Sequence, residues 1–340
     1  MHGVELRSAR GIMTLLGVKG LGPVTAMKLA DRFSTLGEAA EAGHEGLKGL
    51  ATEPVRRLLA DGGPALAEAV AKADDELGRA AEIGAVVLSV FDEAYPRRLK
   101  DIPDRPLVIY TSGDLSLLDR SVACVGSREP TRFGATVAER LATMLGEAGW
   151  TIVSGLARGI DAACHEAALA CGAPTAAILG SGIDVYASDA AFSLASRIVD
   201  AGGLIVTEQP LGREADPASL IRRNRIQTGV SAATFFMQAN MESGTMHSVR
   251  YALLQGRPVY APGVPAAFAG EPLNHAAMCM TRMDPLQFGR AIDAKPAVME
   301  AIERMGRSRI AIEVAGRDSY PEILAQLDAL VAAPEARPAP

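Results

Sequence analysis

The feature that most constrains the fold is a series of short apolar segments between residues 121 and 265, most of which end in glycine or a small polar residue. Helical stretches such as RFGATVAERLATMLGEAG separate these segments, which are SVACVGS, GWTIVSG, PTAAILG, GLIVTEQ, AATFFMQA and PVYAPG. Nearly continuous apolar strands that alternate with helices are typical of a parallel sheet covered on both faces. The sequence therefore predicts an α/β fold with a Rossmann-like, doubly wound, mostly parallel sheet over residues 121–265.

The segments on either side of this core have different compositions. Residues 1–84 carry apolar side chains at helical spacing around a glycine-rich turn, VKGLGP, and predict a small all-helical domain. Residues 85–120 open with the short strand-like run AVVLSV and continue with many prolines and turn residues, which indicates a connecting segment. Residues 266–340 form a divergent segment that predicts one strand, one helix and a disordered tail, namely RIAIEVAG, YPEILAQLDALVAA and PEARPAP.

Bulk composition limits the class of protein. A chain of 340 residues with 49% hydrophobic content can bury the cores of more than one domain. No apolar run reaches membrane-spanning length and the first residues lack a signal-type pattern, so we expect a cytoplasmic protein with no membrane partner. A net charge of −6 argues against coating nucleic acid through bulk charge, but it allows a local basic groove. The four cysteines form no CxxC pair, so we expect neither a zinc site nor disulfides, and we expect no cofactor.

Two loops that follow predicted strands have a composition suited to phosphate binding. In open parallel sheets, ligands bind beyond the carboxyl ends of the strands, where helix N-termini offer free backbone N–H groups. The candidate residues are Gly126, Ser127 and Arg128 in the first loop, and Ser154, Gly155, Arg158 and Gly159 in the second. Because both loops follow strands of one predicted sheet, we expect them to lie at the same edge.

Arginine supplies every fixed positive charge of the predicted core, because no lysine occurs between Ser121 and Pro265. A guanidinium can grip phosphate in bidentate fashion and stack on bases. Further candidate residues are the run Arg222, Arg223, Asn224 and Arg225, and the turn Ser243, Gly244 and Thr245. The four elements predict a groove that holds consecutive phosphates of a single strand. With an aromatic content of 4%, stacking rests on few side chains such as Phe133 and Tyr186.

Each pattern also has an interpretation that involves no ligand. A run of charges is usually a solvated helix face, and glycine-rich turns often serve only close packing. In that interpretation His165 forms a surface or core pair with Asp161, and Asp161 caps its helix or orients Arg158. His247, one turn into the helix beside the presumed phosphate site, is a candidate for ligand contact.

The order of several motifs between Tyr95 and Gly263 resembles one family. The motifs are YPRRLKDIPDRP, GDLSLLDR, CVGSR, VSGLARGIDAACHEAAL, RRNRIQTGVS and SGTMHSVRYALLQGRPVYAPG. This series resembles the DNA-processing protein A family, also called DprA or Smf. The resemblance implies a Rossmann-like domain that binds and protects incoming single-stranded DNA, forms a homodimer and loads the RecA recombinase during natural transformation. GLGPVTAMKLADRF also resembles a helix-hairpin-helix, while nothing after Pro265 resembles the winged helix that many members carry.

An enzymatic function is the alternative. Phosphoribohydrolases of the same broad superfamily carry a PGGxGTxxE motif whose glutamate is catalytic, whereas MESGTMHS places Ser248 at that position. No Walker-type GxxxxGK, metal-ligand spacing or Ser/His/Asp order occurs either. We therefore expect a single-stranded DNA-binding mediator rather than an enzyme. The alternative is a nucleotide-ligand sensor or phosphoribohydrolase-like enzyme that uses the same pocket.

Overall fold

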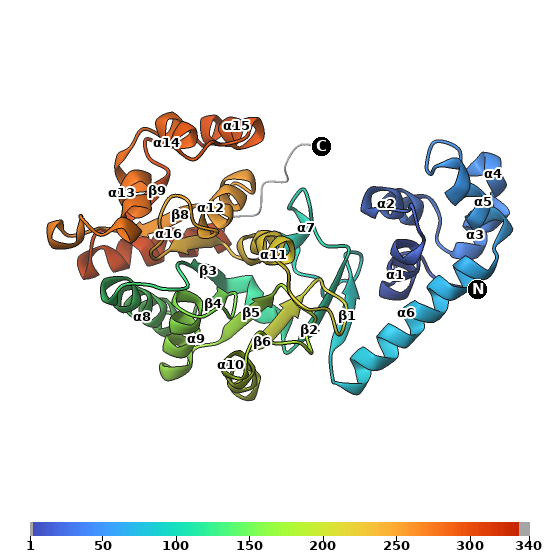
Figure 1. The fold of residues 1–340 in the computed structure, drawn as a ribbon, viewed down its shortest axis with the longest axis horizontal. Helices are drawn as coiled ribbons and strands as arrows, with labels where there is room; N and C mark the ends of the chain where they lie inside the picture. Colours follow the sequence, from blue (N-terminus) through green and yellow to red (C-terminus); the bar gives the residue numbers. More distant parts are fainter. Residues whose placement is uncertain (1–2, 333–340) are drawn as a thin grey trace.

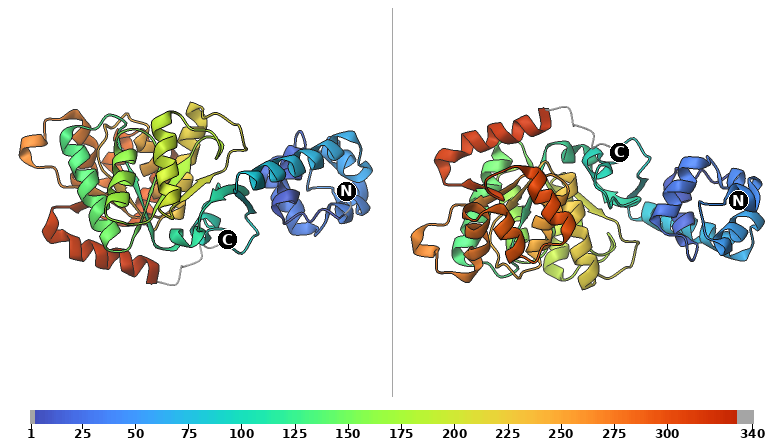
Figure 2. Two further views of the ribbon diagram at one scale, coloured as in Figure 1. Left: turned by 90° about the horizontal axis from the view of Figure 1, so that it is seen from below. Right: turned by 90° about the horizontal axis from the view of Figure 1, so that it is seen from above.

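The computed structural model describes residues 3–332, and the predicted tail PEARPAP lies outside them. A helical N-terminal region precedes a larger α/β region that is built on one sheet (Figure 1). Two further views show the helical region projecting from one end of the α/β region (Figure 2). Within residues 3–332, no helix is both long enough and apolar enough to cross a bilayer.

The N-terminal region contains α1 to α6. Their bounds are Ala9–Gly17, Pro23–Arg32, Leu36–Glu41, Gly43–Gly46, Glu53–Asp61 and Pro64–Glu82. Ser8 begins α1 by accepting a hydrogen bond from the backbone N–H of Gly11 at 3.1 Å, and proline in the first turn begins α2. α1 lies against the long helix α6, to which the ion pair between Arg10 and Asp74 ties it at 2.6 Å. α1 and α2 form the helical hairpin expected from the sequence.

The α/β region contains one nine-stranded sheet in the order β1-β2-β6-β5-β4-β3-β7-β8-β9. β1 and β2 are antiparallel to their neighbours, and all other pairs are parallel. The strands from β1 to β9 are Val86–Ser89, Val108–Ser112, Ser121–Val125, Thr151–Ser154, Thr175–Leu179, Leu204–Thr207, Ala233–Phe236, Val259–Pro262 and Ala311–Val314. This topology confirms the predicted Rossmann-like, mostly parallel fold.

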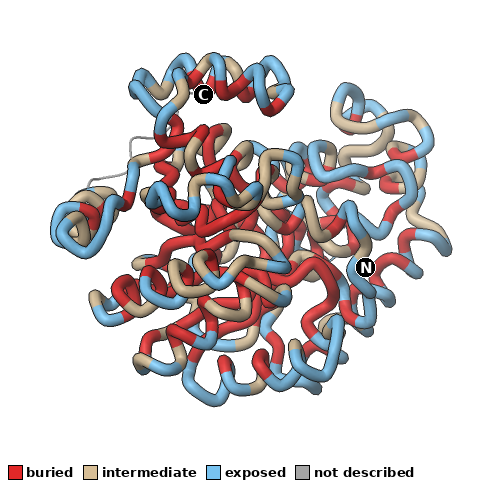
Figure 3. The backbone as a smooth tube through the Cα atoms, turned by 60° about the vertical axis from the view of Figure 1, so that its left-hand side comes forward, coloured by how far each residue is buried: buried red, intermediate tan, exposed pale blue. Residues whose placement is uncertain are grey.

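Helices cover both faces of the sheet (Figure 1). One face carries α8 (Arg132–Glu147), α9 (Ile160–Ala170) and α10 (Asp189–Asp200), together with α16 (Tyr320–Ala332), whose Ile323 and Leu327 pack in the same core as Trp150. The other face carries α11 (Pro217–Val230), α12 (Thr245–Leu254), α13 (His275–Arg282), α14 (Pro285–Ala291) and α15 (Pro296–Met305). Double coverage buries every residue of β3 to β8, which explains why these strands have nearly continuous apolar sequences (Figure 3).

The sheet extends past both ends of the predicted core. Residues 85–120, expected as a connecting segment, contribute β1, the short helix α7 (Arg97–Lys100), β2 and the 3₁₀ helix η1 (Leu115–Arg120). The prolines and Gly113 that flank β2 give its surroundings a loop composition, although Tyr110 pairs with Thr207 of β6. Likewise β9, in the C-terminal segment, pairs in parallel with β8. Residues 266–332 therefore complete the sheet at one edge.

Candidate nucleic-acid interface

A cavity of about 440 Å³ lies beyond the carboxyl ends of β3 and β4. The first turns of α9 and α12 and one side of α11, from Pro217 to Gln227, form its walls. Several predicted site residues line it, namely Gly126, Ser127, Arg128, Arg223, Asn224, Ser243, Gly244 and Thr245. The structure thus brings the first loop, part of the arginine run and the SGT turn together at one edge of the sheet.

Backbone contacts fix the loop after β3. A Cβ atom on Gly126 would lie 2.5 Å from the side chain of Ile160, so only glycine lets α9 approach this closely. The N–H of Ser127 donates to the carbonyl of Gln238 at 2.7 Å, and the hydroxyl of Thr245 donates to the carbonyl of Gly126 at 3.0 Å. These contacts hold the loop in place and leave the side chain of Arg128 exposed at the rim.

The loop after β4 has a different role, although its composition is similar. Ser154 is fully buried and donates to the carbonyl of Cys124 at 2.7 Å. Gly159 has φ +83°, a left-handed conformation that favours glycine, and its Cα lies against the backbone of Arg128. The side chain of Arg158 is 73% exposed and pairs with Glu129 at 2.5 Å, outside the cavity lining. Ser154, Arg158 and Gly159 therefore support or flank the cavity without lining it.

Gly155 makes room for Arg223. A Cβ atom at this position would lie 1.4 Å from Nη1 of Arg223, so any side chain would displace the guanidinium. Arg223 projects from α11 under the loop, is 4% exposed, and donates through Nη1 to the carbonyl of Ile178 at 3.2 Å. It also donates to the amide oxygen of Gln227 at 3.2 Å. The glycine-rich loop after β4 therefore leaves space for the buried guanidinium of Arg223.

The buried charge of Arg223 is only partly compensated. Its nearest carboxylate, on Asp161 in the first turn of α9, is 4.0 Å away, and its Nε has no hydrogen-bond partner. Burial raises the pKa of the Asp161 carboxyl, and the nearby Arg223 guanidinium opposes that shift. Asp161 therefore faces Arg223, rather than Arg158 as the sequence suggested. A buried cation without a close anion is costly, and a phosphate in the cavity that Arg223 lines would offset that cost.

The structure separates the other residues of the arginine run. Arg225 is also 4% exposed, but its guanidinium forms a bidentate pair with Glu208 at 2.9 and 2.7 Å and donates through Nε to the carbonyl of Asp104 at 2.8 Å. Arg222 is exposed, and neither residue lines the cavity. Successive residues on a helix point about 100° apart, so one run of arginines serves three different environments.

The SGT turn places a helix N-terminus at the cavity. Gly244 begins α12 without any side-chain cap, and Ser243 donates its hydroxyl to the carbonyl of Asn240 at 2.9 Å. The first backbone N–H groups of α12 and the positive end of its dipole favour an anion at this position. Together with Arg128 and Arg223, the turn makes the cavity suitable for a phosphate.

The two histidines are not placed to act as bases in the cavity. His165 is fully buried, and burial lowers its pKa to about 3. Because the hydroxyl of Thr175 donates to the carbonyl of Ile152, Nδ1 of His165 carries the proton and donates to Thr175 at 2.7 Å. His247 lies on α12 outside the cavity lining, and burial lowers its pKa as well. Ser248, at the position of the hydrolase glutamate, does line the cavity.

Several lining residues were not predicted from the sequence. Pro217, Leu220 and Ile221 form an apolar wall on α11, and Gln227 follows Arg223 by one helical turn. The turn spacing of Gln227 was a usable signal, because residues four apart on a helix contact each other. Among residues 3–332, no cluster of three or more His, Cys, Asp or Glu side chains could hold a metal ion.

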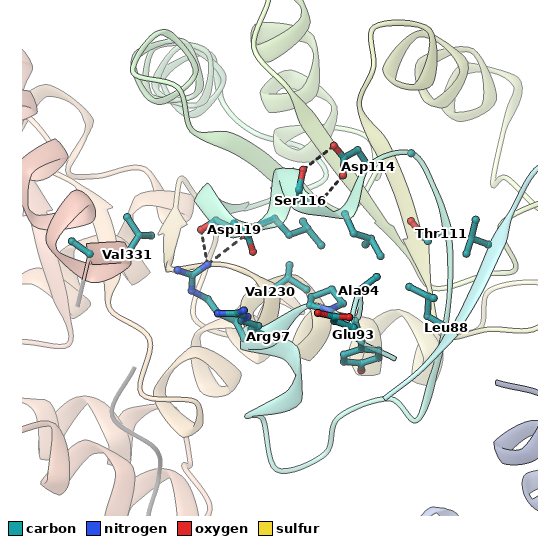
Figure 4. Close-up of a pocket in the computed structure, with 18 residues that line it drawn as sticks. Leu88, Glu93, Ala94, Arg97, Thr111, Asp114, Ser116, Asp119, Val230 and Val331 are labelled. Carbon is teal, nitrogen blue, oxygen red and sulfur yellow. Dashed lines mark hydrogen bonds between the residues drawn. The ribbon is translucent and has the colours of Figure 1, made fainter. Parts of the chain in front are cut away.

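A larger cavity, of about 1070 Å³, lies at the opposite end of the sheet (Figure 4). β1, β2, α7, η1 and the end of α16 line it, and it contains none of the predicted site residues. Three carboxylates, from Glu93, Asp114 and Asp119, belong to its lining. Arg98 donates to the carbonyl of Asp119 at 2.8 Å. Arg97 and Arg98 also line it, so three carboxylates stand against two guanidinium groups, and the smaller cavity, which holds the predicted residues, is the candidate site.

The sequence is similar to those of one protein family. A family model described as DNA recombination-mediator protein A matches residues 86–281. Protein Smf of Synechocystis is 32% identical over 256 residues, which cover 72% of this chain and 62% of that protein. The DNA processing protein DprA of Streptococcus pneumoniae is 37% identical over 177 residues, which cover 52% of this chain and 62% of that protein. The chain thus spans less than two thirds of the length of these relatives.

Solved structures show the same fold. The X-ray structure of DNA processing protein A from Streptococcus pneumoniae is 25% identical, with a TM-score of 0.66 over 92% of this chain and 97% of that one. A structure that describes the single-stranded DNA binding mode of the Helicobacter pylori protein is 23% identical, with a TM-score of 0.52 over 72% of this chain and 95% of that one. Since the family model covers more than half of the 340 residues, the chain belongs to the DNA recombination-mediator protein A family.

Proposed function

We propose that this protein binds single-stranded DNA at the carboxyl edge of the sheet, with one phosphate in the cavity formed by the loop after β3, α11 and α12. The observation that carries the proposal is Arg223, a buried cation that lines the cavity and whose nearest carboxylate is 4.0 Å away. A phosphate supplies the negative charge that this guanidinium lacks nearby, and a charge-assisted hydrogen bond is stronger than a neutral one. The single-stranded DNA binding mode described for the Helicobacter pylori protein supports the same ligand class.

The strand is held by its backbone. One phosphate accepts from Arg223 and from the free N–H groups at the start of α12, while Arg128 at the rim contacts that phosphate or the next one. None of these groups contacts the edge of a base, so binding depends only weakly on the DNA sequence. Affinity falls with added salt, because binding releases counterions from the phosphates. Because the net charge of the chain is −6, the attraction for DNA comes from this local cluster of arginines and helix N–H groups.

The family supports a wider role. We propose that the protein protects incoming single-stranded DNA and delivers it to a RecA-type recombinase in natural transformation, acting as a homodimer in the cytoplasm and without catalytic turnover. The match to the recombination-mediator family supports this role, and so does the identity with DprA and Smf proteins. The candidate cavity also lacks the hydrolase glutamate, because Ser248 stands there.

A nucleotide ligand is the second candidate. The cavity volume of about 440 Å³ falls in the range of small-ligand pockets, and Leu220 and Ile221 offer an apolar wall for a base or ribose. In that case the protein is a sensor of a free nucleotide, or an enzyme that cleaves one. The length of the ligand separates this candidate from the first, because a groove binds a strand more tightly than a mononucleotide.

Fluorescence anisotropy of labelled poly-dT across a salt series tests the proposal. We expect tight binding by the wild type at low salt, and a loss of affinity with a shallower salt slope in Arg128→Ala. Arg140→Ala is the matched control, since this exposed arginine of α8 lies outside the cavity lining. We expect its binding to be close to that of the wild type.

Two outcomes contradict the proposal. If the wild type does not bind poly-dT at low salt, the proposal is overturned. If Arg128→Ala and Arg140→Ala lose the same affinity, the cavity is not the binding site. Competition with dTMP separates the two candidates: displacement of the oligonucleotide by dTMP at a similar concentration favours the nucleotide sensor. If dTMP does not compete, RecA loading onto coated single-stranded DNA becomes the next assay.

A further inference from the structure

A stacked pair of aromatic side chains lies at the start of α8, beside the proposed DNA site. The rings of Phe133 and Phe268 have centroids 4.6 Å apart and an interplanar angle of 23°. Phe133 lies in the first turn of α8, and Phe268 ends the 3₁₀ helix η2 (Ala266–Phe268). Phe268 is 36% exposed, so part of its ring is open to solvent. The protein therefore presents part of an aromatic ring to solvent beside the first turn of α8.

Buried amides hold this pair in place. Asn274 is 1% exposed and donates through Nδ2 to the carbonyl of Phe268 at 3.0 Å. Gln238 is fully buried and donates through Nε2 to the amide oxygen of Asn274 at 2.7 Å and to the hydroxyl of Thr131 at 2.8 Å. Gln238 also accepts from the N–H of Thr131 at 2.9 Å. This satisfied network fixes Phe268 relative to the first turn of α8.

The same network reaches the proposed phosphate site. The carbonyl of Gln238 accepts from the N–H of Ser127, which lines the cavity, at 2.7 Å. Phe133 follows Arg128 by five residues, so their Cα atoms are at most about 18 Å apart. Single-strand binding sites cover several nucleotides, which is enough for a strand seated on Arg128 to reach the aromatic pair. The phosphate site and the pair thus belong to one rigid edge of the molecule.

A packing role alone does not account for these features. The network requires a glycine at position 134, because a Cβ atom there would lie 2.0 Å from the amide oxygen of Gln238. It also requires two buried amides, whose desolvation is unfavourable unless every bond is made. A ring of an ordinary core would be covered, yet Phe268 stays partly open. A rigid exposed aromatic surface is what a nucleobase needs for stacking without a large loss of entropy.

We infer that Phe268, backed by Phe133, is a platform on which one base of the bound single strand stacks. The inference rests on the proposed function and adds a contact to bases beside the contacts to phosphates. Stacking uses the π face that all bases share, so the platform tolerates any sequence and prefers a base over an abasic position. It also supplies an aromatic contact in a chain with only 4% aromatic residues.

The test uses a poly-dT oligonucleotide that carries 2-aminopurine, whose fluorescence is quenched by stacking, at successive positions. We expect Phe268→Leu to lower affinity about five- to hundredfold, in line with the stacking of one base, and to abolish quenching at one position. Phe268→Trp restores an aromatic face and should retain affinity and quenching. Phe192→Leu is the matched control, because Phe192 is 57% exposed and also packs on an aromatic ring, Tyr186, but on α10.

Each outcome separates the platform from the proposed function. If the wild type binds the oligonucleotide and Phe268→Leu changes neither affinity nor quenching, the platform is overturned and the phosphate site stands. If Phe192→Leu lowers affinity as much as Phe268→Leu, any exposed aromatic ring has the same effect, and the platform is also overturned. If the wild type binds no oligonucleotide, the proposed function fails together with the platform. Unchanged melting temperatures in all variants exclude unfolding as the cause of any loss.

Discussion

Arg223 and Arg225 lie two residues apart on α11, and both are 4% exposed, yet their surroundings differ. Arg225 forms a bidentate pair with Glu208, and the carbonyl of Asp104 accepts from its Nε. Arg223 meets two neutral oxygens and a carboxylate 4.0 Å away, and its Nε has no partner. Of the two, Arg223 is the one that lines the cavity. Two arginines that are buried to the same extent therefore differ in the completeness of their pairing, and the proposed binding role of Arg223 rests on that difference.

The largest expected effect is on folding. Arg225→Ala leaves the Glu208 carboxylate buried without its partner, and breaking a buried pair in this way costs about 3–5 kcal/mol. We expect the free energy of unfolding, measured in urea, to fall by this amount. The double variant Arg225→Met with Glu208→Leu removes both charges and should recover much of the loss. If the double variant is as unstable as Arg225→Ala, the ion pair with Glu208 is not the reason that Arg225 stabilises the fold.

The second expected effect is on binding. Arg223→Met removes the incompletely paired cation, so we expect poly-dT affinity to fall about ten- to hundredfold, as for the loss of a hydrogen bond to a charged group. Folding should suffer less than in Arg225→Ala, because Asp161, whose pKa burial already raises, can take up a proton once the guanidinium is gone. Anisotropy and urea unfolding on the same samples check both parts. If Arg223→Met is as unstable as Arg225→Ala, the two arginines do not differ in their structural role.

These roles mark the limit of what the sequence predicts. The strands of the core were identifiable because double coverage of a parallel sheet demands nearly continuous apolar runs, as in Ser121–Val125. β2 escaped prediction because prolines and Gly113 surround its short apolar run, and only its pairing with β6 makes it a strand. Propensity describes a segment, while pairing depends on a partner that is distant in sequence.

The position of the candidate cavity was predictable, but its detailed contacts were not. The loops after β3 and β4 belong to the carboxyl edge, as the fold requires, and their glycines are needed there. The sequence did not reveal that Gly155 makes room for Arg223 or that Glu208 engages Arg225, because both contacts join segments separated by tertiary folding. The arginine run is therefore neither a solvated helix face nor a continuous ligand surface. The direction in which each arginine points from the helix determines its environment.

The pairing of Arg223 with Asp161 also predicts a pH dependence. Asp161 is a carboxyl group with a raised pKa, and in its charged form it competes with a phosphate for Arg223. Protonation removes this competition, so poly-dT affinity should rise as pH falls through the pKa of Asp161, by at most about tenfold per pH unit for one proton. Affinity measured from neutral pH downward should have a flatter profile in Asp161→Asn. A profile of equal slope in both proteins would show that another group titrates.

The smallest effect is expected at Arg158, which the sequence grouped with the phosphate contacts. Its side chain is 73% exposed and pairs with Glu129, which is 77% exposed, so solvent screens the pair and its contribution to stability is at most about 1 kcal/mol. Because Arg158 lies outside the cavity lining, Arg158→Ala should change poly-dT affinity less than twofold at moderate salt, whereas Arg128→Ala causes a clear loss. A loss in Arg158→Ala as large as in Arg128→Ala would extend the DNA path over the loop after β4, and the binding arginines would then include an exposed, ion-paired one.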